Sequence, residues 1–122
     1  MKKNFLEITT FEEILAVTGR PAVPEFNELP EDLRAQHQNH YMQMCIAEAA
    51  NDGVKLDWNN PKQMKYMPYF WCSPSGFSFY ATYYCDSYAA AGDASRLCFV
   101  KREHAAHAGQ TFLQIYSDAL TK

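Results

Sequence analysis

The sequence lacks the features that would direct it to a membrane or to the secretory pathway. It has no run of about 18 apolar residues, which a membrane-spanning helix requires. The N-terminus begins Met1-Lys2-Lys3, but no apolar segment follows these lysines as it would in a signal peptide. The sequence therefore predicts a cytoplasmic protein without a membrane partner, whose cysteines are reduced thiols.

Positive charge is also scarce. The chain has 11 Lys and Arg against 14 Asp and Glu, a net charge of −3. A protein that binds nucleic acid without sequence preference usually carries a basic patch that neutralises several phosphates. No basic run occurs here, although Lys62, Lys65 and Arg96 could converge in the fold. The composition disfavours nucleic-acid binding and leaves a local basic patch open.

Signatures of catalysis and of metal binding are missing as well. The chain contains no phosphate loop, no nucleophile elbow and no dinucleotide fingerprint. Cys72, Cys85 and Cys98 are evenly spaced, but none belongs to the Cys-x-x-Cys pair that is typical of zinc sites. We interpret them as core thiols, with a metal site as the alternative.

Two histidine pairs, His37/His40 and His104/His107, each place two imidazoles on one helix face. Zinc could bind between facing helices, but the pairs lack cysteine or carboxylate neighbours at motif spacing, so exposed polar residues are the favoured interpretation. We predict no catalytic residue, no metal ligand and no cofactor. A metal-dependent enzyme, or a Cys/His enzyme using for example Cys98 and His104, is kept as an alternative.

Aromatic residues are abundant, at 15% of the chain, and many lie in one short stretch. The stretch contains Tyr66, Tyr69, Phe70, Trp71, Phe77, Phe79, Tyr80, Tyr83, Tyr84 and Tyr88. Because each buried aromatic ring removes a large area from water, such a cluster indicates a core, an interface or both.

Periodicity and capping signals predict a single α+β domain over residues 1–122. Thr10 and Glu13 form a capping box, and Gly19 is a natural helix stop. The predicted helices are Thr10 to Thr18, Pro30 to Asn51 and Lys101 to Leu120. The predicted strands are Tyr66 to Cys72, Phe77 to Cys85 and Arg96 to Val100, with a turn at Ser73 to Gly76 and a loop at 86–95. The order α-α-β-β-β-α gives a three-stranded antiparallel sheet packed on helices.

One face of this hairpin has too many aromatic residues for an ordinary solvent-facing surface. If the other face packs on the helices, this face carries Met67, Tyr69, Trp71, Tyr80, Thr82 and Tyr84. Exposed Tyr and Trp at this density favour a protein interface, but they could also stack on bases, or the last helix or the following loop could cover them. The candidate binding residues are Tyr66, Tyr69, Trp71, Tyr80, Tyr84 and Arg96.

Several short motifs resemble a family of small proteins encoded by phages, prophages and mobile elements of Bacteroides-type bacteria. They are Asp57-Trp58-Asn59-Asn60, Lys65-Tyr66-Met67-Pro68-Tyr69-Phe70, Ser75-Gly76-Phe77-Ser78-Phe79, Ser95-Arg96-Leu97-Cys98-Phe99 and His104-Ala105-Ala106-His107-Ala108-Gly109-Gln110-Thr111-Phe112. The resemblance implies a genetic context and no particular activity. This chain departs from it at Val100-Lys101, where the family tends to have Lys-Ser, which leaves the last helix without a capping serine.

The sequence thus favours a non-enzymatic phage or mobile-element accessory protein that binds another protein or itself through the aromatic hairpin. The contact would be formed by the aromatic face or by the strand that contains Pro68, a residue typical of edge strands. A single-stranded nucleic-acid binder using the same aromatics is the first alternative. For Arg96, a structural ion pair, with Asp57 for example, is favoured over an anionic ligand.

Overall fold

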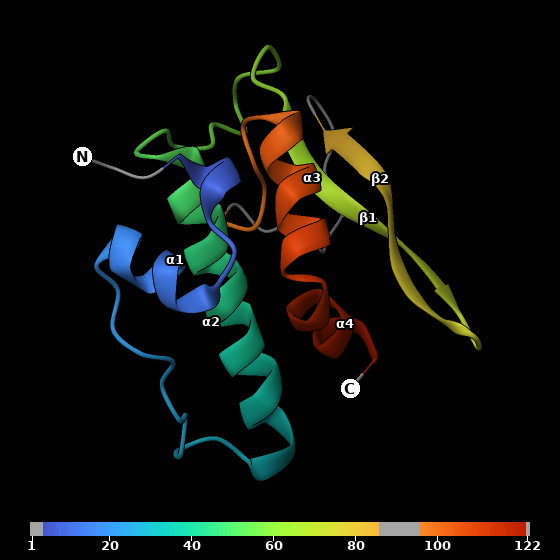
Figure 1. Ribbon diagram of the computed structural model, residues 1–122. Helices are drawn as coiled ribbons and strands as arrows, with labels where there is room; N and C mark the ends of the chain where they lie inside the picture. Colours follow the sequence, from blue (N-terminus) through green and yellow to red (C-terminus); the bar gives the residue numbers. More distant parts are fainter. Residues whose placement is uncertain (1–3, 86–95, 122) are drawn as a thin grey trace.

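The computed structural model describes residues 4–85 and 96–121. Helices stand on one side of a long hairpin that projects from them (Figure 1). In chain order the elements are the 3-10 turn η1 (Phe5–Glu7), helices α1 (Phe11–Thr18) and α2 (Glu31–Asn51), strands β1 (Lys65–Ser73) and β2 (Gly76–Cys85), and helices α3 (Arg102–Thr111) and α4 (Leu113–Thr121). The α+β class is confirmed. None of the helices in the described ranges has the length and apolarity of a membrane span.

Local signals place the first two helices where the sequence predicts them. The Thr10 hydroxyl accepts a hydrogen bond from the amide of Glu13, 3.3 Å away, which satisfies one open donor at the start of α1. Gly19 ends α1 with a φ of 69°, a left-handed conformation in which a side chain would be strained. Asp52 ends α2 in the same region of φ and ψ.

The hydrophobic core lies where η1, α1, α2, α3 and α4 meet. Its fully buried members include Ile8, Ile14, Ile46 and Phe99. Phe5 enters this core between two imidazoles, with ring centroids 5.1 Å from His104 and 5.3 Å from His107. The described cluster therefore joins the N-terminal turn to α3.

The predicted third strand, Arg96 to Val100, is wrong. Within the described residues the sheet has two strands, β1 and β2, and Phe99 forms a single bridge with Tyr66 through two backbone hydrogen bonds of 2.7 and 2.8 Å. On either side of Phe99, the Asn51 side chain donates to the carbonyl of Cys98 and accepts from the amide of Val100, at 3.0 Å each. A helix side chain thus satisfies backbone groups that a sheet ladder would otherwise use.

The predicted last helix is two helices. The chain turns at Phe112, whose φ of −106° and ψ of 33° interrupt the helix, and α4 leaves in a different direction (Figure 1). This turn buries Phe112 and places the ring of Tyr116 5.2 Å from that of Phe70 in β1. As the sequence indicated, Lys101 precedes α3 without a side-chain cap. The predicted loop at 86–95 lies outside the described residues.

Candidate functional site

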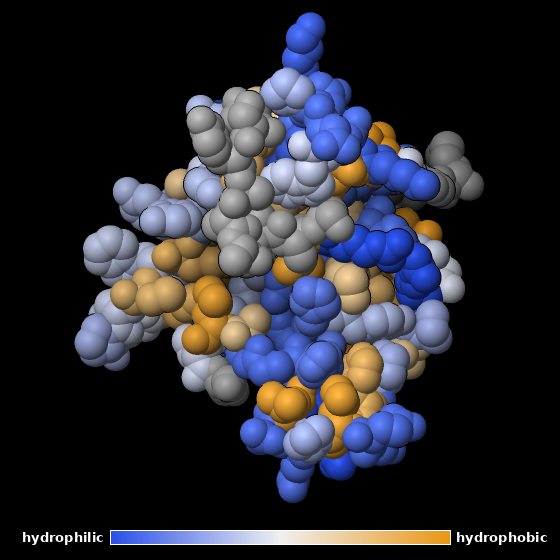
Figure 2. All heavy atoms as spheres, turned by 180° about the vertical axis from the view of Figure 1, so that it is seen from behind, coloured by the Kyte–Doolittle hydropathy of each residue, from blue (hydrophilic) through white to orange (hydrophobic). Residues whose placement is uncertain are grey.

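Exposed aromatic side chains form a continuous row on the outer face of the hairpin. In spatial order they are Tyr83, Tyr69, Tyr80 and Trp71, and we call them the aromatic row. Neighbouring ring centroids lie 6.3 Å (Tyr83 to Tyr69), 5.9 Å (Tyr69 to Tyr80) and 6.2 Å (Tyr80 to Trp71) apart. Tyr69, Trp71 and Tyr80 are each more than half exposed, at 54%, 59% and 62%. In Figure 2 the hairpin extends beyond the body of the molecule at the left edge.

A β-bulge builds this row. Tyr69 pairs with Ala81, but Phe70 pairs with Phe79, so Tyr80 is one extra residue in β2. A bulged residue breaks the strict alternation of side chains between the two faces. Tyr80 therefore contacts both Tyr69 and Trp71.

Because of the bulge, the outer face predicted from the sequence is partly wrong. After Tyr80, each side chain of β2 lies on the face opposite to the one that simple alternation predicts, so Tyr83 joins the aromatic row. Thr82 and Tyr84, which we expected on the outer face, lie with Pro68 and Tyr66 on the other one. Tyr83 is absent from the predicted outer face, because simple alternation assigns it to the packed face.

The opposite face of the hairpin packs on α3 and α4. A Cβ atom added to Gly109 in α3 would lie 2.7 Å from the Cβ of Pro68 and 2.7 Å from a ring carbon of Phe79, closer than carbon atoms can approach. Gly109 therefore lets the helix backbone approach the sheet. Phe70 stacks on Phe77, with centroids 4.8 Å apart, and extends this contact to α4 through Tyr116.

Tyr66 and Tyr84 lie on the helix side near the base of the hairpin and not in the aromatic row. Their ring centroids are 6.4 Å apart, and the guanidinium of Arg102 lies 5.6 Å from the ring of Tyr66. Tyr66 is half-buried, whereas Tyr84 is exposed. Of the predicted tyrosine and tryptophan site residues, the structure brings together Tyr69, Trp71 and Tyr80 in one surface.

The base of the outer face is covered by the loop that precedes β1. Lys65 is fully buried, and its ammonium group donates to the Asn60 carbonyl at 3.0 Å and lies 5.2 Å from the ring centroid of Trp58. Lys65 is one of the three cations that the alternative nucleic-acid binder would use. Its burial removes it from that role, because a phosphate contact requires an accessible ammonium group.

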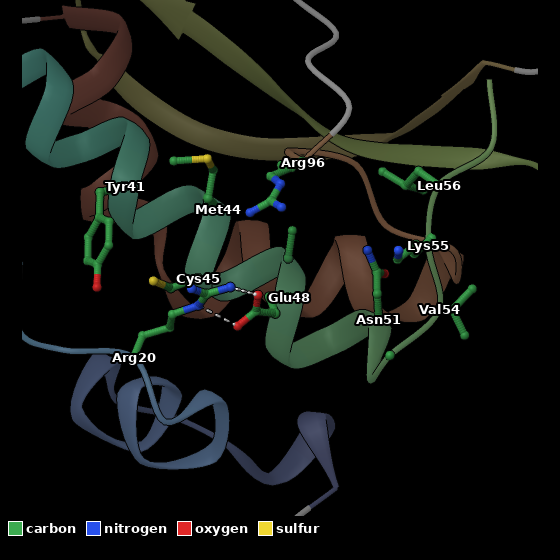
Figure 3. Close-up of a pocket in the computed structure, with 12 residues that line it drawn as sticks. Arg20, Tyr41, Met44, Cys45, Glu48, Asn51, Val54, Lys55, Leu56 and Arg96 are labelled. Carbon is green, nitrogen blue, oxygen red and sulfur yellow. Dashed lines mark hydrogen bonds and ion pairs between the residues drawn. The ribbon is translucent and has the colours of Figure 1, made fainter.

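Arg96, the remaining predicted site residue, lies in a turn and lines a cavity beside α2. The cavity has a volume of about 600 Å³. Figure 3 shows Met44, Arg96 and Leu56 toward the hairpin, and Arg20 and Glu48 toward α1. The prediction that Arg96 begins a strand is wrong, and its position associates it with α2.

An ion pair crosses the α1 side of this cavity. Arg20 donates to both carboxylate oxygens of Glu48, from Nε at 2.9 Å and from a terminal nitrogen at 2.6 Å. The hydrogen bond from Arg20, together with the charges of Arg20 and Arg96, holds the pKa of Glu48 below its usual value. Arg20 and Glu48 are 28 positions apart, and no sequence motif connects them.

Cys45 lies in the wall of the same cavity and is buried. Burial raises the pKa of its thiol, and burial likewise raises the pKa of the neighbouring Tyr41 hydroxyl. A raised pKa keeps the thiol protonated at neutral pH, whereas a nucleophilic cysteine requires the thiolate. The prediction of core thiols is correct for Cys85 and Cys98, which are buried, and wrong for Cys72, which is exposed.

The second histidine pair holds segments of the fold together. His104 contacts the Ala50 carbonyl at the end of α2 through Nδ1 at 3.1 Å, and His107 contacts the Ile8 carbonyl through Nε2 at 2.7 Å. His37 lies against Phe26, and His40 is exposed. Within residues 4–85 and 96–121, no three His, Cys, Asp or Glu side chains are grouped to hold a metal ion.

No protein-family model, no curated protein and no solved structure matches this chain. The structure itself defines the class: an α+β protein whose helices cover one face of a two-stranded hairpin, while the other face exposes the aromatic row.

Proposed function

We propose that this protein acts by binding protein through the aromatic row, and that a second copy of the chain is a partner. The observation that carries the proposal is the exposure of Tyr69, Trp71 and Tyr80, in mutual contact, on a sheet face whose reverse side is packed. Tyr and Trp are the residues most enriched at the energetic centres of protein interfaces. Exposed rings that already contact each other also lose little side-chain freedom on binding.

The edge of β2 supports a second copy as the partner. Within the described residues β2 pairs with β1 along one edge, and no strand pairs with its other edge. An open edge can accept another strand through backbone hydrogen bonds. Two copies paired in this way about a two-fold axis would place their aromatic rows side by side, with rings of one row packed against rings of the other.

The wider role is inferred from the resemblance to proteins of phages and mobile elements. On that basis we propose a non-enzymatic accessory protein that works in the cytoplasm, where its cysteines are reduced. The full burial of Cys98, the cysteine named for the Cys/His alternative, supports a binding role over such an enzyme, because a nucleophilic thiol must be accessible to its substrate. The burial of Lys65 supports a protein partner over single-stranded nucleic acid.

Sedimentation equilibrium at micromolar concentrations tests self-association. Trp71→Ser and Tyr80→Ser should each weaken the dimer by about 2 kcal/mol or more, roughly thirtyfold in dissociation constant, because truncation of a buried aromatic anchor costs that much. Leu120→Ser is the matched control, since Leu120 is 64% exposed on α4, outside the hairpin. The control should dimerise as the unaltered protein does, and all three variants should keep its unfolding midpoint.

Three results would count against this proposal. A monomer at about 100 μM would reject self-association, because a specific interface of useful strength is occupied at that concentration. Equal weakening by Leu120→Ser would show that the aromatic row is not the contact. Salt-dependent binding of a single-stranded oligonucleotide that Trp71→Ser abolishes would assign the row to nucleic acid instead.

A further inference from the structure

We infer that the cavity beside α2 binds a small molecule that joins an oxyanion, either a phosphate monoester or a carboxylate, to an apolar body. This site is separate from the aromatic row and does not depend on the function proposed for it. Three cationic side chains and one anionic side chain line the cavity, a net formal charge of +2. The whole chain, in contrast, has a net charge of −3. The cavity therefore has the opposite sign of charge to the protein that contains it.

Two of the cationic groups form no ion pair with the described residues. Arg20 is paired with Glu48 through two hydrogen bonds, so this pair contributes little net field. In the part of the chain that the structure describes, neither the guanidinium of Arg96 nor the ammonium of Lys55 has a hydrogen-bond or ion-pair partner. An oxyanion that reaches either group would receive charge-assisted hydrogen bonds, which are about twice as strong as neutral ones.

Hydrogen bonds hold the backbone of the segments that carry these two cations. The Gln63 side chain donates to the Lys55 carbonyl at 3.0 Å, and the Val54 amide donates to the Asn51 carbonyl at 3.0 Å. Asn51 also holds the Cys98 carbonyl, two residues beyond Arg96. A site whose walls are already held in place loses less entropy on binding.

The rest of the lining selects the body of the ligand. Met44, Ala47, Val54 and Leu56 contribute apolar surface to the cavity wall. Its volume of about 600 Å³ lies within the range of roughly 300–1,000 Å³ that is usual for small-molecule sites. An inorganic anion would leave most of this space and its apolar wall unused, so we expect an aromatic or aliphatic group on the oxyanion.

Isothermal titration calorimetry with four probes tests the inference: phenyl phosphate, benzoate, inorganic phosphate and neutral benzyl alcohol. We expect a dissociation constant of about 1 mM for phenyl phosphate, benzoate or both, as is ordinary for ligands of this size. Inorganic phosphate and benzyl alcohol should each bind at least tenfold more weakly, because each makes only half of the contacts. Binding of phenyl phosphate alone identifies a phosphate ligand, and binding of benzoate alone identifies a carboxylate.

Two substitutions with opposite expected effects make the test specific. Arg96→Gln should weaken binding at least about tenfold, because it removes a charged donor from an exposed position without disturbing the core. Glu48→Gln should strengthen binding, because it removes the negative charge and releases Arg20. Lys62→Gln removes the same charge as Arg96→Gln from an exposed site outside the cavity lining and should change binding less than twofold.

The inference is overturned if neither oxyanion saturates the protein. It is also overturned if Arg96→Gln and Lys62→Gln weaken binding equally, which would indicate a non-specific charge effect, or if Arg96→Gln and Glu48→Gln change binding in the same direction. Circular dichroism should show that the variants are folded. These outcomes are independent of the sedimentation experiment, because the cavity and the aromatic row share no residue.

Discussion

Gly109 offers the sharpest test of how the hairpin is mounted on the helices. A glycine within a helix normally costs about 1 kcal/mol relative to alanine, so Gly109→Ala would stabilise an isolated α3. In the folded protein the added Cβ would lie 2.7 Å from the Cβ of Pro68 and from a ring carbon of Phe79. Favourable carbon contacts lie at about 3.5–4.0 Å, so helix and strand must separate by about 1 Å.

The two effects can be set against each other. Overpacking of this kind costs about 1–3 kcal/mol, and the upper part of the range applies because the proline ring and the strand backbone cannot rotate away. After the gain in helix propensity, we expect Gly109→Ala to lower the free energy of unfolding by about 1–2 kcal/mol. For a chain of this length that corresponds to a midpoint lower by about 3–8 °C.

Urea and thermal unfolding followed by circular dichroism measure this difference. Gln110→Ala is the matched control, because Gln110 is the exposed neighbour of Gly109 in α3 and the substitution should change stability by less than about 0.5 kcal/mol. The account of close helix–sheet approach is refuted if Gly109→Ala is as stable as the unaltered protein or more stable. That result would mean that α3 and the hairpin can separate without loss.

Two further predictions concern the interior. Asn51→Ala should lower the free energy of unfolding by about 2–4 kcal/mol in urea titrations, because it removes the two hydrogen bonds that the Asn51 side chain makes with the Cys98 carbonyl and the Val100 amide. A loss below about 1 kcal/mol would contradict the bridging role. Burial lowers the pKa of His104 from its ordinary 6.5. The stability that depends on neutral His104 is therefore complete above pH 6.5 and is lost as the pH falls through the lowered pKa. His104→Gln should therefore flatten the fall in unfolding free energy between about pH 7 and pH 5, whereas His40→Gln, at an exposed position, should preserve it.

The sequence predicted best those features that neighbouring residues decide. The hydrogen bond between Thr10 and Glu13 and the left-handed Gly19 fix the ends of α1, and both depend on atoms at most a few residues away. The turn at Ser73 to Gly76 likewise places Cys72 opposite Phe77, as the hairpin prediction required. Capping and tight-turn geometry are local, so a single sequence contains the information they need.

Features that depend on competition between distant groups were not predicted. The segment around Phe99 has the composition of a strand, but Asn51 of α2 takes the backbone groups on either side of it. The last helix has a continuous helical pattern, yet it turns at Phe112, where burial of that ring and contact between Tyr116 and Phe70 are gained together. In both cases tertiary contacts outweigh a weak local preference.

In the two candidate sites as well, some features follow from the sequence and others only from the tertiary structure. The sequence by itself determined that an aromatic hairpin exists and placed Tyr69, Trp71 and Tyr80 among its six candidate binding residues. Only the tertiary structure decided that a bulge at Tyr80 moves Tyr83 to the outer face and into the aromatic row. The alternation of side chains can be read from a sequence, but an extra residue in one strand shows only in the pairing of the two strands. Only the fold, too, brings Arg96 to the cavity beside α2, since no spacing along the chain encodes a contact between segments that meet through packing.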